Sequence, residues 1–185
     1  MFAEKLAAVG GRVSRVGRDE LPRAVARVVP AQKPVLVTPE LAGLAEQLRD
    51  LGLEAHVGTR DTADEGGGSL ESLLDEAGAG VVRAFAGIVA TGTLAVGPGG
   101  GNGGLLAAFP PLSIIVLDEA ALRETMEDVF AELGARFSEL GGEVVFVSGP
   151  SRTADIEMMS VVGVHGPTAL EVFIVSGEEA QGGGR

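Results

Sequence analysis

The segment with the densest set of reactive side chains runs from Gly149 to Glu157 and reads GPSRTADIE. Ser151 and Thr153 carry hydroxyls that can donate to an anion, and Arg152 can clamp a carboxylate or phosphate through charge-assisted hydrogen bonds. Gly149 allows the backbone to approach a ligand closely. Free backbone N–H groups at the start of a following turn would attract the same anion. We therefore expect Gly149, Ser151, Arg152 and Thr153 to bind a small anionic ligand.

Three groups in or near this segment could move a proton and are the candidate catalytic residues: Asp155, Glu157 and His165. A structural interpretation stays open beside this one. The two carboxylates can pair with Arg152, and His165 can hold a turn before its Gly-Pro dipeptide. Ser151, Asp155 and His165 include the residue types of a hydrolase triad, but no Gly-x-Ser-x-Gly elbow surrounds Ser151, which argues against a hydrolase.

An apolar run at residues 144–147 comes directly before this segment and predicts a buried strand. Ligands in parallel α/β sheets bind outside the carboxyl ends of strands, so this position suits a ligand site. Short apolar runs alternate with amphipathic patterns along the whole chain, which predicts an α/β domain with a mainly parallel sheet covered on both faces. The strand-like runs are 35–37, 55–57, 87–90, 93–96, 112–117, 144–147 and 170–175, and the helical patterns are 2–9, 20–29, 38–51, 69–77 and 118–137.

Two of these patterns are especially clear. The run 112–117 is apolar almost throughout and is typical of a central strand buried on both faces. Asp118 can then cap the strongest helix of the sequence. The apolar stripe of that helix consists of Leu122, Met126, Val129, Phe130, Leu133 and Phe137.

A glycine-rich stretch at residues 97–104 contains one G-x-G-x-x-G match, from Gly99 to Gly104. In so glycine-rich a run the match carries little weight, and the following residues 105–109 are too few for a full crossover helix. No Lys-Ser or Lys-Thr pair follows, so the stretch is not a Walker loop. We interpret it as a flexible connection or lid.

The composition limits the classes of function. The 185 residues carry 14 basic and 26 acidic side chains, for a formal net charge of −12. A surface with this excess of acidic side chains repels phosphate backbones and anionic lipids. We therefore expect no nucleic-acid partner and no membrane partner. No apolar stretch is long and continuous enough to span a bilayer, and residues 1–12 lack the apolar core of a signal peptide, so we expect a soluble cytoplasmic protein.

The chain contains no cysteine and two histidines. It therefore has no thiolate for an iron–sulfur cluster and no histidine-rich metal site. We expect no cofactor and no metal to be bound by this chain.

Several segments together resemble the LUD domain, and in particular the lactate-utilisation protein C family. The resemblance rests on the string SGPSRTADIE at residues 148–157 and on GVHGP at residues 163–167. The Thr91-Gly92-Thr93 turn, the Pro110-Pro111 pair before an apolar strand and the helix from Glu119 agree in order and spacing. Two positions depart from the family: Ala90 stands where a glutamate often precedes Thr-Gly-Thr, and Thr168 stands where an arginine commonly follows Gly-Pro.

The resemblance implies a three-layer α/β/α fold similar to the sugar-phosphate isomerase and CoA-transferase group. It places Thr91, Gly92, Thr93 and Gly166 among the ligand-binding residues. It also implies a subunit of a complex that oxidises L-lactate to pyruvate, with the iron–sulfur clusters on partner subunits. The alternatives are a stand-alone enzyme and a sensor, either of them for a sugar phosphate or CoA ester.

The same reasoning predicts the domain organisation. We expect one α/β domain over residues 1–176, with a helical N-terminal part over about residues 1–30. Residues 177–185 are charged and glycine-rich, which predicts a disordered tail.

Overall fold

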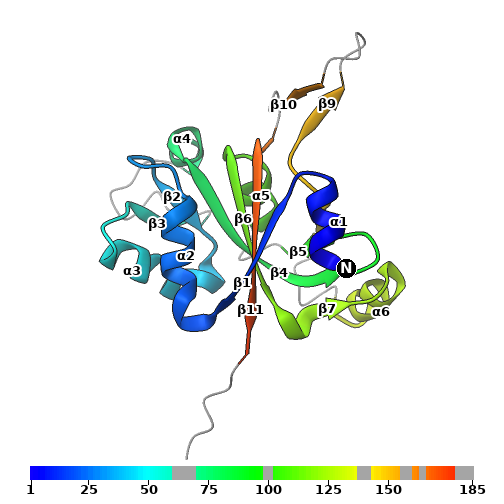
Figure 1. The fold of residues 1–185 in the computed structure, drawn as a ribbon. Helices are drawn as coiled ribbons and strands as arrows, with labels where there is room; N and C mark the ends of the chain where they lie inside the picture. Colours follow the sequence, from blue (N-terminus) through cyan, green and yellow to red (C-terminus); the bar gives the residue numbers. More distant parts are fainter. Residues whose placement is uncertain (60–69, 98–101, 137–142, 155–159, 163–165, 178–185) are drawn as a thin grey trace, which may run out of the picture.

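The computed structural model describes residues 1–59, 70–97, 102–136, 143–154, 160–162 and 166–177. Its centre is a nine-stranded mixed sheet (Figure 1). Six strands pair in parallel in the order β1-β11-β6-β4-β2-β3. Beyond them, β5 runs antiparallel to β4, β8 runs antiparallel to β5, and the short β7 pairs with the end of β4. The predicted α/β class with a mainly parallel sheet is confirmed.

The strands of this sheet are β1 (Arg12–Gly17), β2 (Val35–Val37), β3 (Ala55–Val57), β4 (Ala79–Ile88), β5 (Thr93–Val96), β6 (Leu112–Asp118), β7 (Leu122–Arg123), β8 (Val145–Val147) and β11 (Ala169–Ser176). A separate antiparallel pair consists of β9 (Arg152–Ala154) and β10 (Ser160–Val162). The α-helices are α1 (Phe2–Ala8), α2 (Leu21–Val28), α3 (Ala42–Asp50), α4 (Leu70–Glu76), α5 (Gly103–Ala108) and α6 (Met126–Arg136). Three 3-10 turns are η1 (Arg18–Glu20), η2 (Pro39–Leu41) and η4 (Glu119–Ala121).

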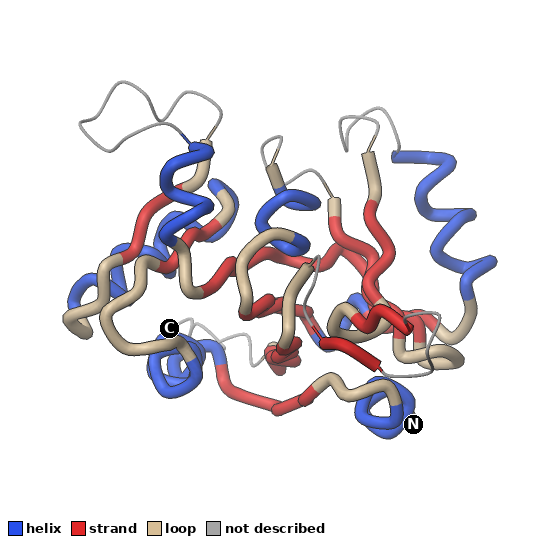
Figure 2. The backbone as a smooth tube through the Cα atoms, turned by 90° about the horizontal axis from the view of Figure 1, so that it is seen from above, coloured by secondary structure: helices blue, strands red, loops and turns tan. Residues whose placement is uncertain are grey.

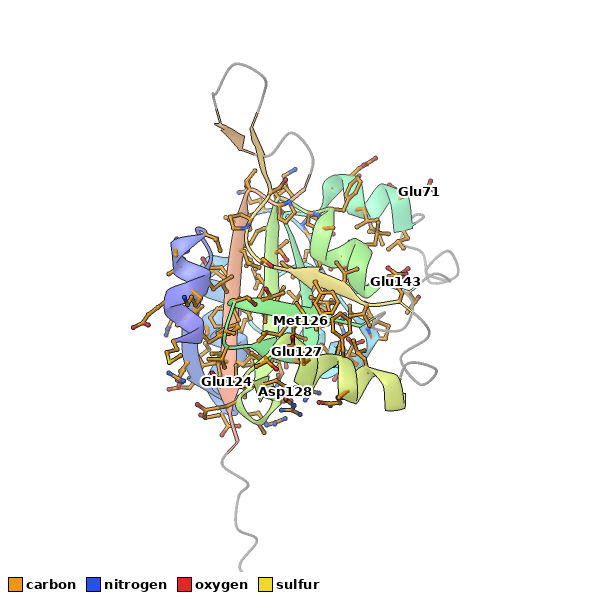
Figure 3. All side chains as sticks on the ribbon, turned by 90° about the vertical axis from the view of Figure 1, so that its right-hand side faces the viewer. Glu71, Glu124, Met126, Glu127, Asp128 and Glu143 are labelled. Atoms are coloured by element: carbon orange, nitrogen blue, oxygen red, sulfur yellow. The ribbon has the colours of Figure 1, made fainter. Side chains whose placement is uncertain are left out.

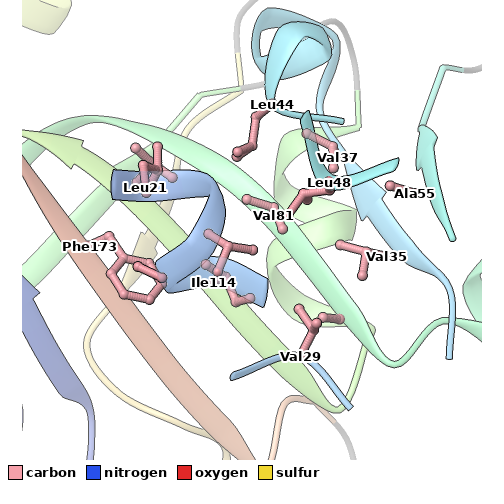
Figure 4. Packing of buried hydrophobic residues seen from close by; sticks show 14 of the residues in the cluster. Leu21, Val29, Val35, Val37, Leu44, Leu48, Ala55, Val81, Ile114 and Phe173 are labelled. Atoms are coloured by element: carbon pink, nitrogen blue, oxygen red, sulfur yellow. The ribbon is translucent and has the colours of Figure 1, made fainter. Parts of the chain in front are cut away.

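Helices cover both faces of the sheet, because its central strands are apolar at successive positions. In β6, Ile114 and Val116 pack into one core cluster and Ile115 and Leu117 pack into another. Successive side chains of a strand point to opposite faces, so the two clusters lie on opposite sides of the sheet. Helices α2 and α3 contribute to the first cluster, and α1, α4 and α5 to the second (Figures 2 and 4). The arrangement is the predicted three-layer α/β/α fold.

Helix α6 begins later than the sequence indicates, so the expected cap at Asp118 is wrong. Asp118 ends β6, where its carboxylate pairs with Arg83 and Arg18, and a 3-10 turn and β7 follow it. The cap is instead built by Thr125 and Asp128. The Asp128 amide donates to Thr125 Oγ1 at 3.2 Å, and Thr125 N and Oγ1 donate to Asp128 Oδ2 at 2.9 and 2.8 Å.

The hydrogen bonds from Thr125 hold the pKa of Asp128 below its ordinary value, because they favour the ionised carboxylate. Of the predicted apolar stripe, Val129 and Leu133 are buried against β4 and β5 in a third cluster. Phe130 instead lies at the surface, 55% exposed, where its ring contacts that of Phe146. Phe137 lies outside the described residues.

Two further expectations are corrected. The run 144–147 forms β8, but β8 is partly exposed, because among the described strands it pairs with β5 alone. In the glycine-rich stretch, Gly103 and Gly104 are not part of a loop: they open α5, which packs on β4 and β6. Residues 98–101 of that stretch lie outside the described part of the chain.

The N-terminal part also holds a strand that the sequence analysis did not anticipate. Between the predicted helices α1 and α2 lies β1, which pairs in parallel with β11 from Arg12↔Glu171 to Gly17↔Ser176. Its sequence RVSRVG has two arginines and two valines, so it lacks the continuous apolar run that marks the central strands.

Gly80, the second residue of β4, provides a test of how α5 packs on the sheet. A Cβ atom at this position would collide with the carbonyl oxygen of Leu106 in α5. We expect Gly80→Ala to lower the free energy of unfolding by about 1–3 kcal/mol or more, because the helix must move off the sheet. The measurement is urea denaturation followed by far-ultraviolet circular dichroism.

Gly134→Ala is the matched control. Gly134 lies in α6, and a Cβ atom there meets nothing within 4 Å. Replacement should raise stability by about 0.5–1 kcal/mol, since alanine is the better helix former. Equal stability changes in the two variants would contradict the close approach of α5 to β4.

Candidate functional site

The turn between β4 and β5 carries the Thr91-Gly92-Thr93 motif. The Gly92 amide donates to the Ile88 carbonyl at 2.8 Å, which closes the turn. Gly92 has a φ of +72°, a left-handed conformation that glycine adopts without steric cost. The motif therefore has a local structural reason for its glycine, and the turn places the two threonines on either side of it.

The hydroxyls of this turn form a chain of hydrogen bonds with the segment that follows β8. Thr91 Oγ1 donates to Thr93 Oγ1 at 2.8 Å, and Thr93 Oγ1 lies 2.9 Å from Ser148 Oγ. Thr93 is only 4% exposed, whereas Thr91 and Ser148 are exposed. The structure thus joins Thr91 and Thr93 to the start of the SGPSRTADIE string.

Helix α1 and the residue after it pack directly against this hydroxyl chain. A Cβ atom on Gly92 would lie 2.6 Å from the backbone nitrogen of Leu6, and one on Gly149 would lie 3.1 Å from Val9 Cγ2. Both glycines were predicted to bind a ligand. In the structure, the group that approaches each of them closely comes from the N-terminal segment.

Ser151 and Gly166, which follow the contacts of Ser148 and Gly149 along the chain, lie next to each other. The Ser151 amide donates to the Pro167 carbonyl at 2.8 Å. A Cβ atom on Gly166, whose φ is +103°, would lie 3.0 Å from Ser151 Cβ. The next residue, Thr168, donates through its amide and its hydroxyl to the Pro111 carbonyl at 2.8 and 3.1 Å.

Ser151 and Gly166 do not lie at the carboxyl ends of parallel strands, where the sequence predicted the motif. Pro111 comes immediately before β6 and Thr168 immediately before β11, so Ser151 and Gly166 lie at the amino-terminal ends of these two strands. The prediction was wrong because β8 is not a central parallel strand. After β8 the chain leaves Ser148, approaches Val9 just after α1, and then reaches the amino-terminal ends of β6 and β11.

The remaining predicted residues belong to the β9–β10 pair and its surroundings. The backbone of Arg152 and Thr153 forms part of β9, which projects away from the sheet with β10 (Figure 1). The candidate catalytic residues Asp155, Glu157 and His165 lie outside the described residues.

The two positions noted as departures, Ala90 and Thr168, both have defined surroundings. Ala90 donates its amide to the backbone carbonyl of Glu124 at 3.0 Å. Thr168 uses its hydroxyl on the Pro111 carbonyl, as described above.

A group of charged residues at the carboxyl ends of the central strands was not predicted from the sequence. Asp118 of β6 pairs with Arg83 of β4 and, at 3.5 Å, with Arg18. Arg15 of β1 pairs with Glu119 at 3.2 Å. The sequence signal was present: Arg83 is a charged residue inside an otherwise apolar run, and such a residue needs a partner.

Two classes of feature are absent from the part of the chain that the structure describes. Its histidine and acidic side chains do not gather into any group of three or more that could hold a metal ion. Its helices are all too short or too polar to cross a membrane.

The fold and the site define the chain as a three-layer α/β/α protein with a hydroxyl-lined turn beside its N-terminal helix. The LUD domain model matches residues 1–175, and the chain belongs to this family. It is similar to a crystal structure of a DUF162 family protein from Deinococcus radiodurans, with a TM-score of 0.69, 25% identity and coverage of 95% of this chain and 94% of that one.

Two curated relatives carry the name Lactate utilization protein C. The protein from Halalkalibacterium halodurans is 35% identical over 59% of this chain and 49% of its own length. The protein from Deinococcus radiodurans is 29% identical over 94% of this chain and 77% of its own length. The chain therefore spans about half the length of the first relative and about three quarters of the second.

Gly92→Ala tests the contact between α1 and the Thr91–Thr93 turn. The substitution strains a left-handed residue and forces a methyl group against the backbone of Leu6. We expect faster hydrogen exchange at the amides of α1 and a lower melting temperature. Gly43→Ala is the control, because a Cβ atom at Gly43 in α3 meets nothing within 4 Å. Unchanged exchange in α1 of the Gly92 variant would contradict the contact.

Proposed function

We propose that this protein acts in lactate utilisation, as a subunit of a complex that oxidises L-lactate to pyruvate. The observation that carries the proposal is the LUD family match over residues 1–175, together with curated relatives named for lactate utilisation. The reaction removes two electrons and two protons from lactate, so it requires an electron acceptor.

The acceptor is expected on other polypeptides. Iron–sulfur clusters are held by cysteine thiolates, and these 185 residues contain no cysteine. In the proposed complex, iron–sulfur partner subunits carry the clusters and take up the two electrons. This chain contributes a ligand site and the surfaces on which the partners assemble.

The proposed ligand is a small anion such as a carboxylate. Support comes from the residue types of the SGPSRTADIE string and from the contacts of its first residues. Ser148 joins the hydroxyl chain of Thr91 and Thr93, and Ser151 lies beside Gly166. In this proposal Arg152 and Thr153 complete the binding groups, and Asp155, Glu157 and His165 are the acids and bases.

The reaction is tested by lactate-dependent reduction of a dye acceptor. The purified chain is assayed alone and then together with candidate cysteine-rich partner proteins. We expect no turnover by the chain alone and a higher rate when it is added to those proteins, because only they supply the acceptor. Robust turnover by the chain alone, or no change of rate on mixing, would overturn the proposed complex and favour a stand-alone enzyme or a sensor.

The ligand site is tested by calorimetric titration with lactate and with inorganic phosphate. A charge-assisted contact contributes about 1.5–3 kcal/mol, so Arg152→Ala should weaken anion binding by about tenfold or more. Lys33→Ala removes an exposed cation outside the string and should leave the affinity unchanged. If Arg152→Ala lowers the melting temperature but keeps the affinity, Arg152 neutralises a neighbouring carboxylate and does not bind the anion.

A further inference from the structure

Strand β1 forms one outer edge of the sheet. Among the described strands it pairs with β11 alone, so one side of its backbone has no strand beside it. Figure 2 shows β1 at the margin of the molecule, between α1 and α2. In a strand that pairs on one side only, every second residue points its N–H and C=O groups away from the paired strand. These groups form a template on which another strand can pair.

The surface beside this edge is hollowed. A cavity of about 500 Å³ lies where α1 meets the start of β1 and Glu171 of β11. Its walls combine three charged residues, Glu4, Arg12 and Glu171, with small ones that leave room beside the backbone of β1: Ala3, Ala7, Gly11, Val13 and Ser14. A chain in extended conformation, which needs room close to the backbone, can therefore approach β1.

Residues 1–30 carry a net positive charge by sequence, opposite in sign to the net charge of the rest of the chain. Residues 1–30 contain six basic side chains and three acidic ones, whereas the rest of the chain contains eight basic and 23 acidic ones. On and just after β1, Arg12, Arg15 and Arg18 are 72%, 65% and 69% exposed. Each has an acidic partner, but a guanidinium carries five N–H donors, so donors remain for a further anion.

The acidic residues gather elsewhere. Glu124, Glu127, Asp128 and Glu143 are exposed on the side of the molecule that carries α6 (Figure 3). The described surface therefore has an acidic side at α6 and a row of exposed, ion-paired arginines at β1.

A second copy of this chain is a poor occupant of the β1 edge. In the antiparallel register of two β1 strands centred on Arg15, Arg15 of one copy would face Arg15 of the other and Arg12 would face Arg18, and like charges in facing positions are destabilising. Charged residues on outer strands are a known means of preventing pairing between identical edges. The charge favours an acidic strand over a copy of β1.

We propose that the β1 edge binds an extended acidic segment of a partner protein, which adds to the sheet as a further strand. Backbone hydrogen bonds to β1 supply the pairing, and carboxylates of the segment meet the arginines of the edge. The inference rests on the topology and charge of β1 and does not depend on the role in lactate utilisation.

The probe is a synthetic peptide of about eight alternating valine and glutamate residues, within the usual length of a strand. We expect binding that weakens as salt rises, with slowed hydrogen exchange at the amides of β1. A peptide with lysine in place of glutamate should not bind. An acidic peptide methylated on alternate backbone nitrogens should bind at least about tenfold more weakly, because it cannot complete the hydrogen bonds.

Arg15→Glu provides the matched test in the protein. Arg15 makes an exposed ion pair with Glu119, so its replacement should change stability little. We expect it to weaken binding of the acidic peptide by about tenfold or more, whereas Lys33→Glu, an equal change of charge far from β1, should not. If the melting temperature of Arg15→Glu falls, Arg15→Gln replaces it.

Three results would overturn the proposal. The first is equal binding of the lysine peptide and the glutamate peptide, and the second is no binding or no protection of β1. The third is a dimer in sedimentation experiments whose β1 amides are protected without peptide, which would assign the edge to a second copy of this chain.

Discussion

The burial of β6 on both faces is the constraint on which the rest of the structure depends. A strand in the middle of a sheet whose successive residues Ile114, Ile115, Val116 and Leu117 are all almost fully buried must have a helical layer on each side. Helices α2 and α3 meet this need on one face, and α1, α4 and α5 meet it on the other. The polar Ser113 is the exception: it is fully buried, and its hydroxyl has no partner among the described residues.

The layer that contains α1 also assembles the candidate site. Three parts of the chain meet there: the N-terminal segment at Leu6 and Val9, the β4–β5 turn at Gly92, and the segment after β8 at Gly149. The two glycines allow backbones to lie close together, so the hydroxyls of Thr93 and Ser148 come within hydrogen-bonding distance. A helix needed to cover the sheet therefore also fixes the position of the residues of the candidate site.

Much of this arrangement follows from the sequence, and the exceptions have physical causes. Strands β2, β6 and β11 were predicted because their apolar runs are continuous. The start of α6 was not, because Asp118 has the residue type of a helix cap but is held by two arginines. In the site, the residue types were evident, but the contact between Thr93 and Ser148 joins positions 55 residues apart, which no local pattern reports.

The pairing of β1 with β11 joins the first and the last of the described strands of the sheet. During synthesis, β1 is made before the other described strands of the sheet, and the strand beside it is made after all of them. Contacts between residues so distant in sequence form slowly, because the loop between them must first be closed. Helix α1 is joined to β1 and also contacts Gly87 and Gly92. Its packing on the sheet therefore depends on β1 being in place or on these contacts being strong enough to hold it. The N-terminal segment is therefore the part of this protein whose folding waits longest for its neighbours.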